Sequence, residues 1–138
     1  MSFVSRALVA LLFIPSGISK ITGFSGTVAY ITANNVPMPE AAAVIAILVE
    51  LGLGVLLLVG YQTRWVALAM FFYVLVLPFI FHAYWSAPPA RLTIERIMFY
   101  KDLAIAGGLL AFATWGAGAW SIDGARGRAG ATGEMHAA

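Results

Sequence analysis

The sequence predicts an all-α integral membrane protein, built as an antiparallel bundle of four transmembrane helices. Hydrophobic residues make up 62% of the chain and charged residues only 10%, whereas soluble domains are about half apolar and a quarter charged. The mean hydropathy is +0.91. Four apolar stretches are long enough to cross a bilayer, and no polar stretch between them is long enough to fold separately. We therefore expect one four-helix domain over residues 1–123.

The first span is expected at residues 3–19, with Arg6 near its start and Lys20 after its end, each able to extend toward a headgroup layer. Residues spaced four, three, four and three apart form one helical stripe that should face the bundle: Arg6, Ala10, Phe13, Gly17 and Lys20. A cleaved secretory signal is the alternative interpretation. The absence of a small-residue cleavage site and the presence of further spans favour a transmembrane helix.

Residues 21–40 are too polar to cross the membrane and contain several glycine and asparagine residues. Apolar residues among small and polar ones at 27–34 predict a short helix that lies on the membrane interface. Pro37 and Pro39 should end this segment and lead into the second span.

The second span, expected at residues 41–60, carries Glu50 at its centre. An ionised side chain at that depth costs about 2.5–3.5 kcal/mol, so Glu50 needs a partner or a proton. Ala43, Ala46 and Gly54 share its helical face. Such small residues allow another helix to approach closely.

The third span is expected at residues 65–85, because aromatic residues mark both of its ends. His82 lies near the far end, either as a neutral hydrogen-bonded side chain or as a residue that handles protons or contacts a ligand. The second histidine, His136, lies in the tail, and the carboxylates are scattered. We therefore expect no metal or haem site.

The fourth span, expected at residues 94–118, carries Lys101 and Asp102 within apolar sequence. These charges are unlike a solvated helix face, because apolar residues continue on both sides of them. Residues 124–138 are rich in glycine, alanine and charge and are expected to be disordered.

Antiparallel order places five charged or titratable residues in the same half of the bilayer: Lys20, Glu50, His82, Lys101 and Asp102. From the helical rise, His82 should lie roughly 5 Å, Lys101 roughly 10 Å and Glu50 roughly 15 Å below that surface. One interpretation is a purely architectural ion-pair network in which Glu50 pairs with Lys101. The other is a polar pocket that holds a small amphipathic molecule.

Several short motifs follow one another in a specific order: Arg6, SGISK at 16–20, TVAYITANNVPMP at 27–39, Glu50, GYQTR at 60–64, His82, KDLAIAGGLL at 101–110 and WSID at 120–123. In this order they resemble the DoxX family of small four-helix bacterial membrane proteins. The family usually has asparagine at the position of Asp102. The aspartate adds a negative charge beside Lys101, which favours an architectural pair.

The resemblance implies a multi-pass protein of the bacterial inner membrane with quinone-linked redox work. Some relatives are the membrane subunit of a thiosulfate:quinone oxidoreductase, and others join oxidoreductase assemblies concerned with oxidative and thiol stress. The chain has no cysteine, so a partner protein would carry the electrons and no covalent cofactor is expected. A quinone is the expected ligand. The candidates for ligand binding or proton handling are Glu50, His82, Lys101, Asp102 and Lys20, and those for partner docking are Arg91 and Arg96.

A rival interpretation is a non-catalytic scaffold, an assembly factor or a small proton-coupled permease, so the sequence does not decide whether the chain is an enzyme. The net charge of +2 and the scattered basic residues argue against nucleic acid and fit a lipid bilayer. Homo-oligomerisation stays open. Arginines on the terminal side (Arg6, Arg64, Arg126, Arg128) outnumber the basic residues on the other (Lys20, Arg91, Arg96), which predicts that both termini are cytoplasmic.

Overall fold

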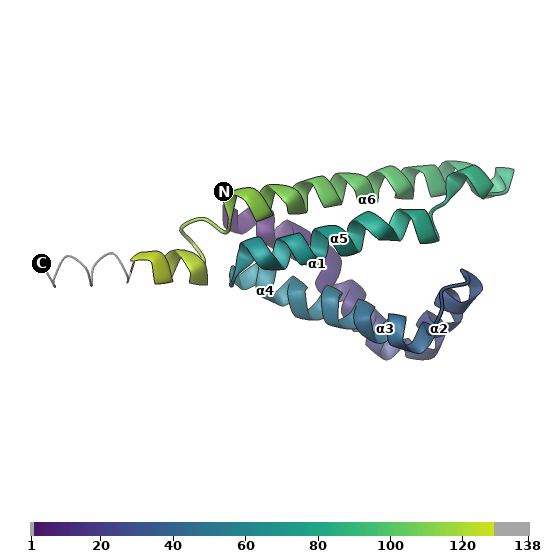
Figure 1. The fold of residues 1–138 in the computed structure, drawn as a ribbon, viewed down its shortest axis with the longest axis horizontal. Coiled ribbons are helices and arrows are strands. Elements are labelled where there is room, and N and C mark those ends of the chain that lie inside the picture. The colour runs from purple at the N-terminus through teal and green to yellow at the C-terminus, as the bar shows by residue number, and fades with distance from the viewer. Residues whose placement is uncertain (1, 129–138) are drawn as a thin grey trace, which may run out of the picture.

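The computed structural model describes residues 2–128, and within them it confirms the all-α membrane bundle: they form helices and no strand. The elements are α1 (Ser2–Thr22), α2 (Phe24–Ala33), α3 (Pro39–Ile47), the π-helix η1 (Leu48–Leu53), α4 (Gly54–Val59), α5 (Thr63–Phe81), the 3-10 turn η2 (Tyr84–Ser86) and α6 (Pro89–Trp115) (Figure 1).

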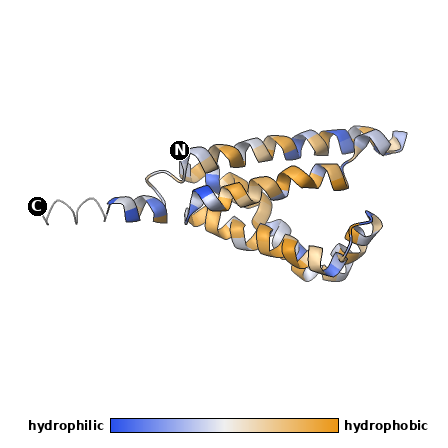
Figure 2. Cartoon of the chain, viewed as in Figure 1, coloured by the Kyte–Doolittle hydropathy of each residue, from blue (hydrophilic) through white to orange (hydrophobic). Residues whose placement is uncertain are grey.

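Four stretches of this part of the chain are long and apolar enough to cross a membrane: Ser2–Thr22, Pro39–Val59, Thr63–Ser86 and Pro89–Trp115. The second of them runs without interruption through α3, η1 and α4. Figure 2 shows these helices as largely hydrophobic, with hydrophilic segments that interrupt α6.

The fourth span differs from the expected range 94–118 at both ends. It begins earlier, at Pro89, because proline suits the first turn of a helix and the extended Pro88 leads directly into it. It ends at Trp115, because Gly116 follows with φ +76 and breaks the helix.

The short helix expected between the first two spans is present as α2, and it starts a few residues earlier than residue 27. Gly23 separates it from α1, and its last turn is closed by backbone hydrogen bonds from Asn34 to Ile31 and from Asn35 to Thr32. Pro39 is the first residue of α3, so the second span begins two residues before the expected start at 41.

The helices form a wedge. α5 and α6 pack along each other, while α1 packs against α3, η1 and α4. The two groups meet where α5 contacts η1 and α4, and they diverge toward α2 (Figure 1). The hydrophobic core lies where they meet and includes the fully buried residues Leu57, Ala67, Met70 and Leu109.

The expected inward stripe of α1 is confirmed, because Arg6, Ala10, Phe13 and Gly17 are all buried. Gly17 lies at a close crossing with η1, where a Cβ atom would stand 2.8 Å from the backbone nitrogen of Leu51. A larger residue there would push the two helices apart.

The prediction of a disordered tail from residue 124 onward is wrong for residues 124–128, which belong to a helical stretch at 122–128. The Ser121 hydroxyl accepts a hydrogen bond from the backbone N–H of Gly124 at 2.9 Å, as an N-cap does. Arg128 donates to the carbonyl of Ala119 at 3.0 Å. The remainder of the predicted tail, 129–138, lies outside the described residues.

Candidate functional site

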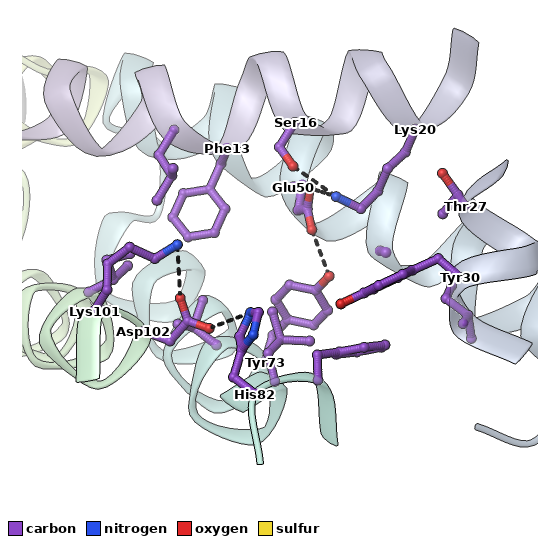
Figure 3. Close-up of a pocket in the computed structure, with 17 residues that line it drawn as sticks. Phe13, Ser16, Lys20, Thr27, Tyr30, Glu50, Tyr73, His82, Lys101 and Asp102 are labelled. Carbon is purple, nitrogen blue, oxygen red and sulfur yellow. Dashed lines mark hydrogen bonds and ion pairs between the residues drawn. The ribbon is translucent and has the colours of Figure 1, made fainter. Parts of the chain in front are cut away.

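A cavity of about 240 Å³ lies between α1, α2, η1, α5 and α6, and we call it the inner cavity. Its polar lining residues are Ser16, Lys20, Thr27, Tyr30, Glu50, Tyr73, His82, Lys101 and Asp102 (Figure 3). All five residues that the sequence analysis placed in one half of the bilayer therefore line one cavity.

Glu50 is positioned by the π-helix η1, which widens the turn from which its side chain projects. Such segments occur frequently at functional sites. Glu50 is only 5% exposed, and Ala43, Ala46 and Gly54, expected on the same face, are buried as well. The sequence predicted this buried face but not the π-helical geometry.

Each carboxylate oxygen of Glu50 accepts one hydrogen bond. The Lys20 ammonium donates to Oε2 at 2.7 Å, and the Tyr73 hydroxyl donates to Oε1 at 2.8 Å (Figure 3). Lys20 also donates to the Ser16 hydroxyl at 2.8 Å. The buried acid thus has a cation from α1 and a neutral donor from α5.

The predicted pairing of Glu50 with Lys101 is wrong. The Lys101 ammonium lies 3.6 Å from Asp102 Oδ1 and donates weakly to the Met98 sulfur at 3.2 Å. Lys20 takes its place, because it extends from the inward stripe of α1 toward Glu50 rather than toward the headgroups. Depth along the bilayer did not reveal which of the two lysines faces Glu50.

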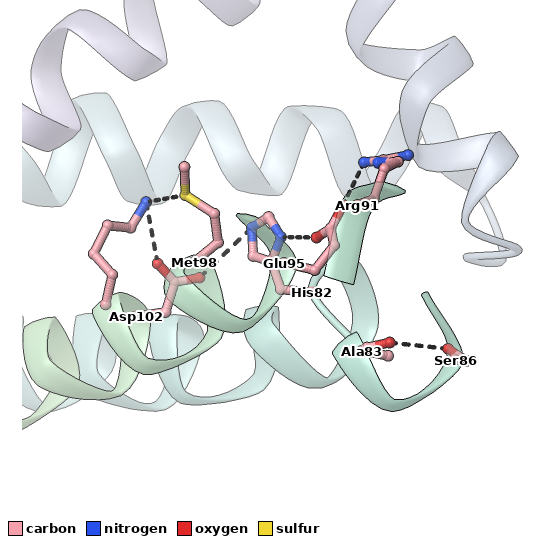
Figure 4. Close-up of polar contacts among 8 residues, drawn as sticks. His82, Ala83, Ser86, Arg91, Glu95, Met98 and Asp102 are labelled. Carbon is pink, nitrogen blue, oxygen red and sulfur yellow. Dashed lines mark hydrogen bonds and ion pairs between the residues drawn. The ribbon is translucent and has the colours of Figure 1, made fainter. Parts of the chain in front are cut away.

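A second polar group surrounds His82, the residue that follows α5. Its Nδ1 lies 2.8 Å from Glu95 Oε2, and its Nε2 lies 3.9 Å from Asp102 Oδ2 (Figure 4). Arg91 donates to the other oxygen of Glu95. Both imidazole nitrogens therefore face carboxylates of α6 rather than Glu50.

Glu95 and Tyr73 were missed as site residues. Glu95 carried a signal that could have revealed it: Arg91, Glu95 and Asp102 are spaced four and seven residues apart, so they share one face of α6. Tyr73 carried none, because an aromatic residue inside an apolar span resembles ordinary core.

Both docking candidates are exposed. Arg91 is also paired with Glu95, four residues along α6. Within residues 2–128, no three histidine, aspartate or glutamate side chains are grouped closely enough to hold a metal ion.

Charged residues at the opposite end of the bundle bind backbone atoms. The side chain of Arg6, on the inward stripe of α1, is fully buried and donates to the carbonyl oxygens of Leu58, at 2.8 Å, and Trp120. This arrangement satisfies carbonyls at the end of α4, where intrahelical partners are missing. Asp123 accepts hydrogen bonds from the backbone N–H groups of Gln62 and Thr63, each at 2.8 Å.

We call Arg6, Leu58, Gln62, Thr63, Trp120 and Asp123 the terminal clamp. Burial alone would raise the pKa of Asp123, but the N–H donors of Thr63 and Gln62 and the charge of Arg126 outweigh it and hold the pKa below its ordinary value. The clamp joins the start of α1, the turn between α4 and α5, and the segment after α6.

Comparison with known proteins agrees with this architecture. The DoxX family model matches residues 1–83. The inner membrane protein YphA of Escherichia coli (strain K12) is 38% identical over 120 residues, which cover 87% of this chain and 86% of YphA. The inner membrane protein YqjF of the same organism is 39% identical over 123 residues, which cover 87% of each.

No solved structure matches the chain. The two relatives are inner membrane proteins by name, and the four apolar helices found here fit the same multi-pass location. The family model covers more than half of the sequence, and both relatives align over nearly all of it. The chain therefore belongs to the DoxX family.

Proposed function

We propose that the inner cavity binds the headgroup of a quinone and that the chain acts as the membrane subunit of a quinone-linked oxidoreductase. The observation that carries this proposal is the convergence of donors and acids from separate helices on one cavity inside the bundle. A quinone headgroup presents two carbonyl oxygens, which need hydrogen-bond donors, and its reduction consumes protons, which need nearby acids.

The volume of the cavity suits a ring rather than a large ligand. Sites for drug-sized molecules measure about 300–1,000 Å³, whereas this cavity measures about 240 Å³. Phe13, Val74, Leu77 and Phe81 supply apolar walls for a ring. An isoprenoid tail would remain among the lipid chains outside the bundle.

Lys101 is the donor most available to a ligand. Its ammonium has only a 3.6 Å contact with Asp102 and a weak sulfur acceptor, and its side chain is 46% exposed. Lys20 and Tyr73 are already bound to Glu50. A ligand carbonyl can therefore recruit Lys101 without breaking the Glu50 group.

The electrons in this proposal come from a partner protein that docks at the loop end of α6, near the exposed Arg96. We also propose that both termini are cytoplasmic, which places this docking face in the periplasm. An alkaline phosphatase fusion after Asp123 should then be inactive, and an active fusion would reverse the orientation.

Titration of the purified protein in lipid nanodiscs with a short-chain ubiquinone tests the binding proposal. We expect saturable one-to-one binding that weakens about tenfold in Lys101→Met, the equivalent of about 1.4 kcal/mol for a lost hydrogen bond. Arg96→Gln is the matched control, because it removes an exposed cation of the same helix, and it should bind like the wild type.

Absence of saturable binding, or equal affinity in both variants, would refute the proposal. Copurification of a tightly bound protein without any small molecule would then favour the scaffold interpretation.

A further inference from the structure

A second cavity, of about 260 Å³, lies beside the inner cavity at the loop end of α5 and α6. Asn34, Ser86, Arg91 and Glu95 supply its polar lining, and we call it the outer cavity. Tyr30 of α2 and Phe81 of α5 line both cavities.

The Tyr30 and Phe81 rings stack with their centroids 5.4 Å apart and their planes within 16° of parallel. Because both rings line both cavities, the stacked pair forms an apolar wall between them. Polar groups in the inner cavity are thereby separated from the more polar outer cavity.

One pair of polar side chains connects the two cavities past this wall. Glu95 lines the outer cavity and His82 lines the inner one, yet Glu95 Oε2 and His82 Nδ1 are only 2.8 Å apart. The other imidazole nitrogen faces Asp102, which also lines the inner cavity (Figure 4). The two nitrogens of one ring thus face carboxylates on opposite sides of the wall.

We propose that Glu95 and His82 carry protons between the outer cavity and Asp102 in the inner cavity. A protonated Glu95 gives its proton to Nδ1, and the imidazolium then releases the Nε2 proton to Asp102. The ring returns to its first tautomer before the next transfer, because Nδ1 gives one proton to water and Nε2 takes one from water. Only O–H and N–H bonds form and break, one proton moves inward in each cycle, and no electron is transferred.

The second transfer requires a small movement or a bridging water. The distance of 3.9 Å between His82 Nε2 and Asp102 Oδ2 exceeds that of a direct hydrogen bond, whereas the Glu95 contact is already within range. Rotation of the imidazole toward Asp102 lengthens the contact with Glu95. This alternation is what a relay between two carboxylates requires.

The two carboxylates at the ends of this relay have matching surroundings. Arg91 binds the outer carboxylate of Glu95, and Lys101 lies beside the inner carboxylate of Asp102. Tyr30 stays a neutral hydroxyl, because burial raises its pKa and the negative Glu95 raises it further against the opposing effect of Arg91. Each carboxylate therefore has its own cation, and the imidazole between them has none.

The inference rests on the proposed function, since a quinone reduced in the inner cavity would need this proton supply, but its first test requires no ligand. The chain contains two histidines, so the full-length His136→Gln variant leaves His82 as the sole histidine. Labelling with ¹⁵N-histidine in nanodiscs then reports the tautomer of His82 alone.

We expect both ring nitrogens of His82 to give exchange-averaged signals, because the proton moves between them. Adding Glu95→Gln should fix one neutral tautomer, Glu95→Asp should restore averaging, and the exposed Arg64→Gln should leave the spectrum unchanged. A fixed tautomer in the parent protein, or an averaged one in Glu95→Gln, would overturn the relay.

A second test measures the rate of proton delivery to the inner cavity. A hydroxynaphthoquinone changes colour on protonation, so a stopped-flow pH jump reports how fast the bound molecule receives a proton. Glu95→Gln should slow this step roughly 100-fold, the scale of a positioned proton donor, while the binding constant changes little because Glu95 lies outside the inner cavity.

The outcomes separate the two proposals. Equal protonation rates with intact binding would refute the relay alone. Absence of binding in the wild type would refute the proposed function, and the histidine spectrum would still decide the relay.

Discussion

The terminal clamp and the inner cavity both contain buried charged side chains, but they satisfy those charges with different partners. In the clamp, Arg6 and Asp123 bind backbone carbonyl and N–H groups. In the inner cavity, Lys20, Glu50 and Lys101 contact other side chains. Backbone atoms at helix ends are fixed by the fold, whereas side chains can exchange partners with a ligand or a proton. The contacts of the clamp are therefore fixed by the fold, and we propose that those of the inner cavity exchange.

The motifs that carry the family resemblance divide between these two regions. Arg6, the GYQTR turn at 60–64 and WSID at 120–123 contribute to the clamp. SGISK at 16–20, Glu50, His82 and the start of KDLAIAGGLL at 101–110 line the inner cavity. A family motif in this chain thus either stabilises the fold or contributes to the candidate site. Only the three-dimensional contacts distinguish these two roles.

The largest loss of stability is expected on breaking the clamp with Arg6→Ala. The guanidinium is fully buried, so its removal leaves the carbonyls of Leu58 and Trp120 without donors. Charged hydrogen bonds contribute roughly 1.5–3 kcal/mol each, so the loss should be at least about 3 kcal/mol. Thermal unfolding in detergent measures it, with the exposed Arg64→Ala as the matched control. Equal unfolding temperatures for these two variants would show that the clamp is not structural.

A smaller loss should follow from separating Glu50 and Lys20. Breaking a buried ion pair costs about 3–5 kcal/mol, and the exposed quarter of the Lys20 side chain reduces this to about 2 kcal/mol for Glu50→Gln or Lys20→Met. The double variant should lose less than the sum, because no uncompensated charge remains. Strictly additive losses in the same unfolding assay would argue against direct pairing.

Asp123→Ala should cost about 1 kcal/mol, the usual effect of losing a side chain that caps helix N–H groups. The pKa of Asp123 is lowered in the folded protein, so its contribution is complete above about pH 4 and is lost as the pH falls through the folded pKa. The difference in unfolding temperature between wild type and variant should therefore shrink in acid. A difference independent of pH would mean that the charge of Asp123 is not what holds the N–H groups.

The sequence predicted the fold because membrane helices follow from hydropathy and the 3.6-residue period alone. The inward stripe of α1 and the small-residue face around Glu50 also depend only on that period. The pairing of Glu50 with Lys20 depends on how far α1 is rotated and where it crosses η1, which no local pattern determines. The π-helix and the role of Tyr73 were missed for the same reason, since both arise from tertiary packing. Ligand binding by these residues is a prediction that the titrations described above test.

Lys101→Met should have the smallest effect on stability and so separates folding from binding most sharply. The Lys101 side chain is 46% exposed, and its ammonium lies 3.6 Å from Asp102. Such a contact contributes no more than about 0.5–1 kcal/mol to stability. Its effect should add to that of Glu50→Gln, since the two residues have different partners. If Lys101→Met weakens quinone affinity and leaves the unfolding temperature unchanged, Lys101 acts in binding rather than in folding. Variants of the terminal clamp cannot make this distinction, because they lower stability. A large loss of stability would place Lys101 with the architectural charges instead and remove the contrast between the two regions.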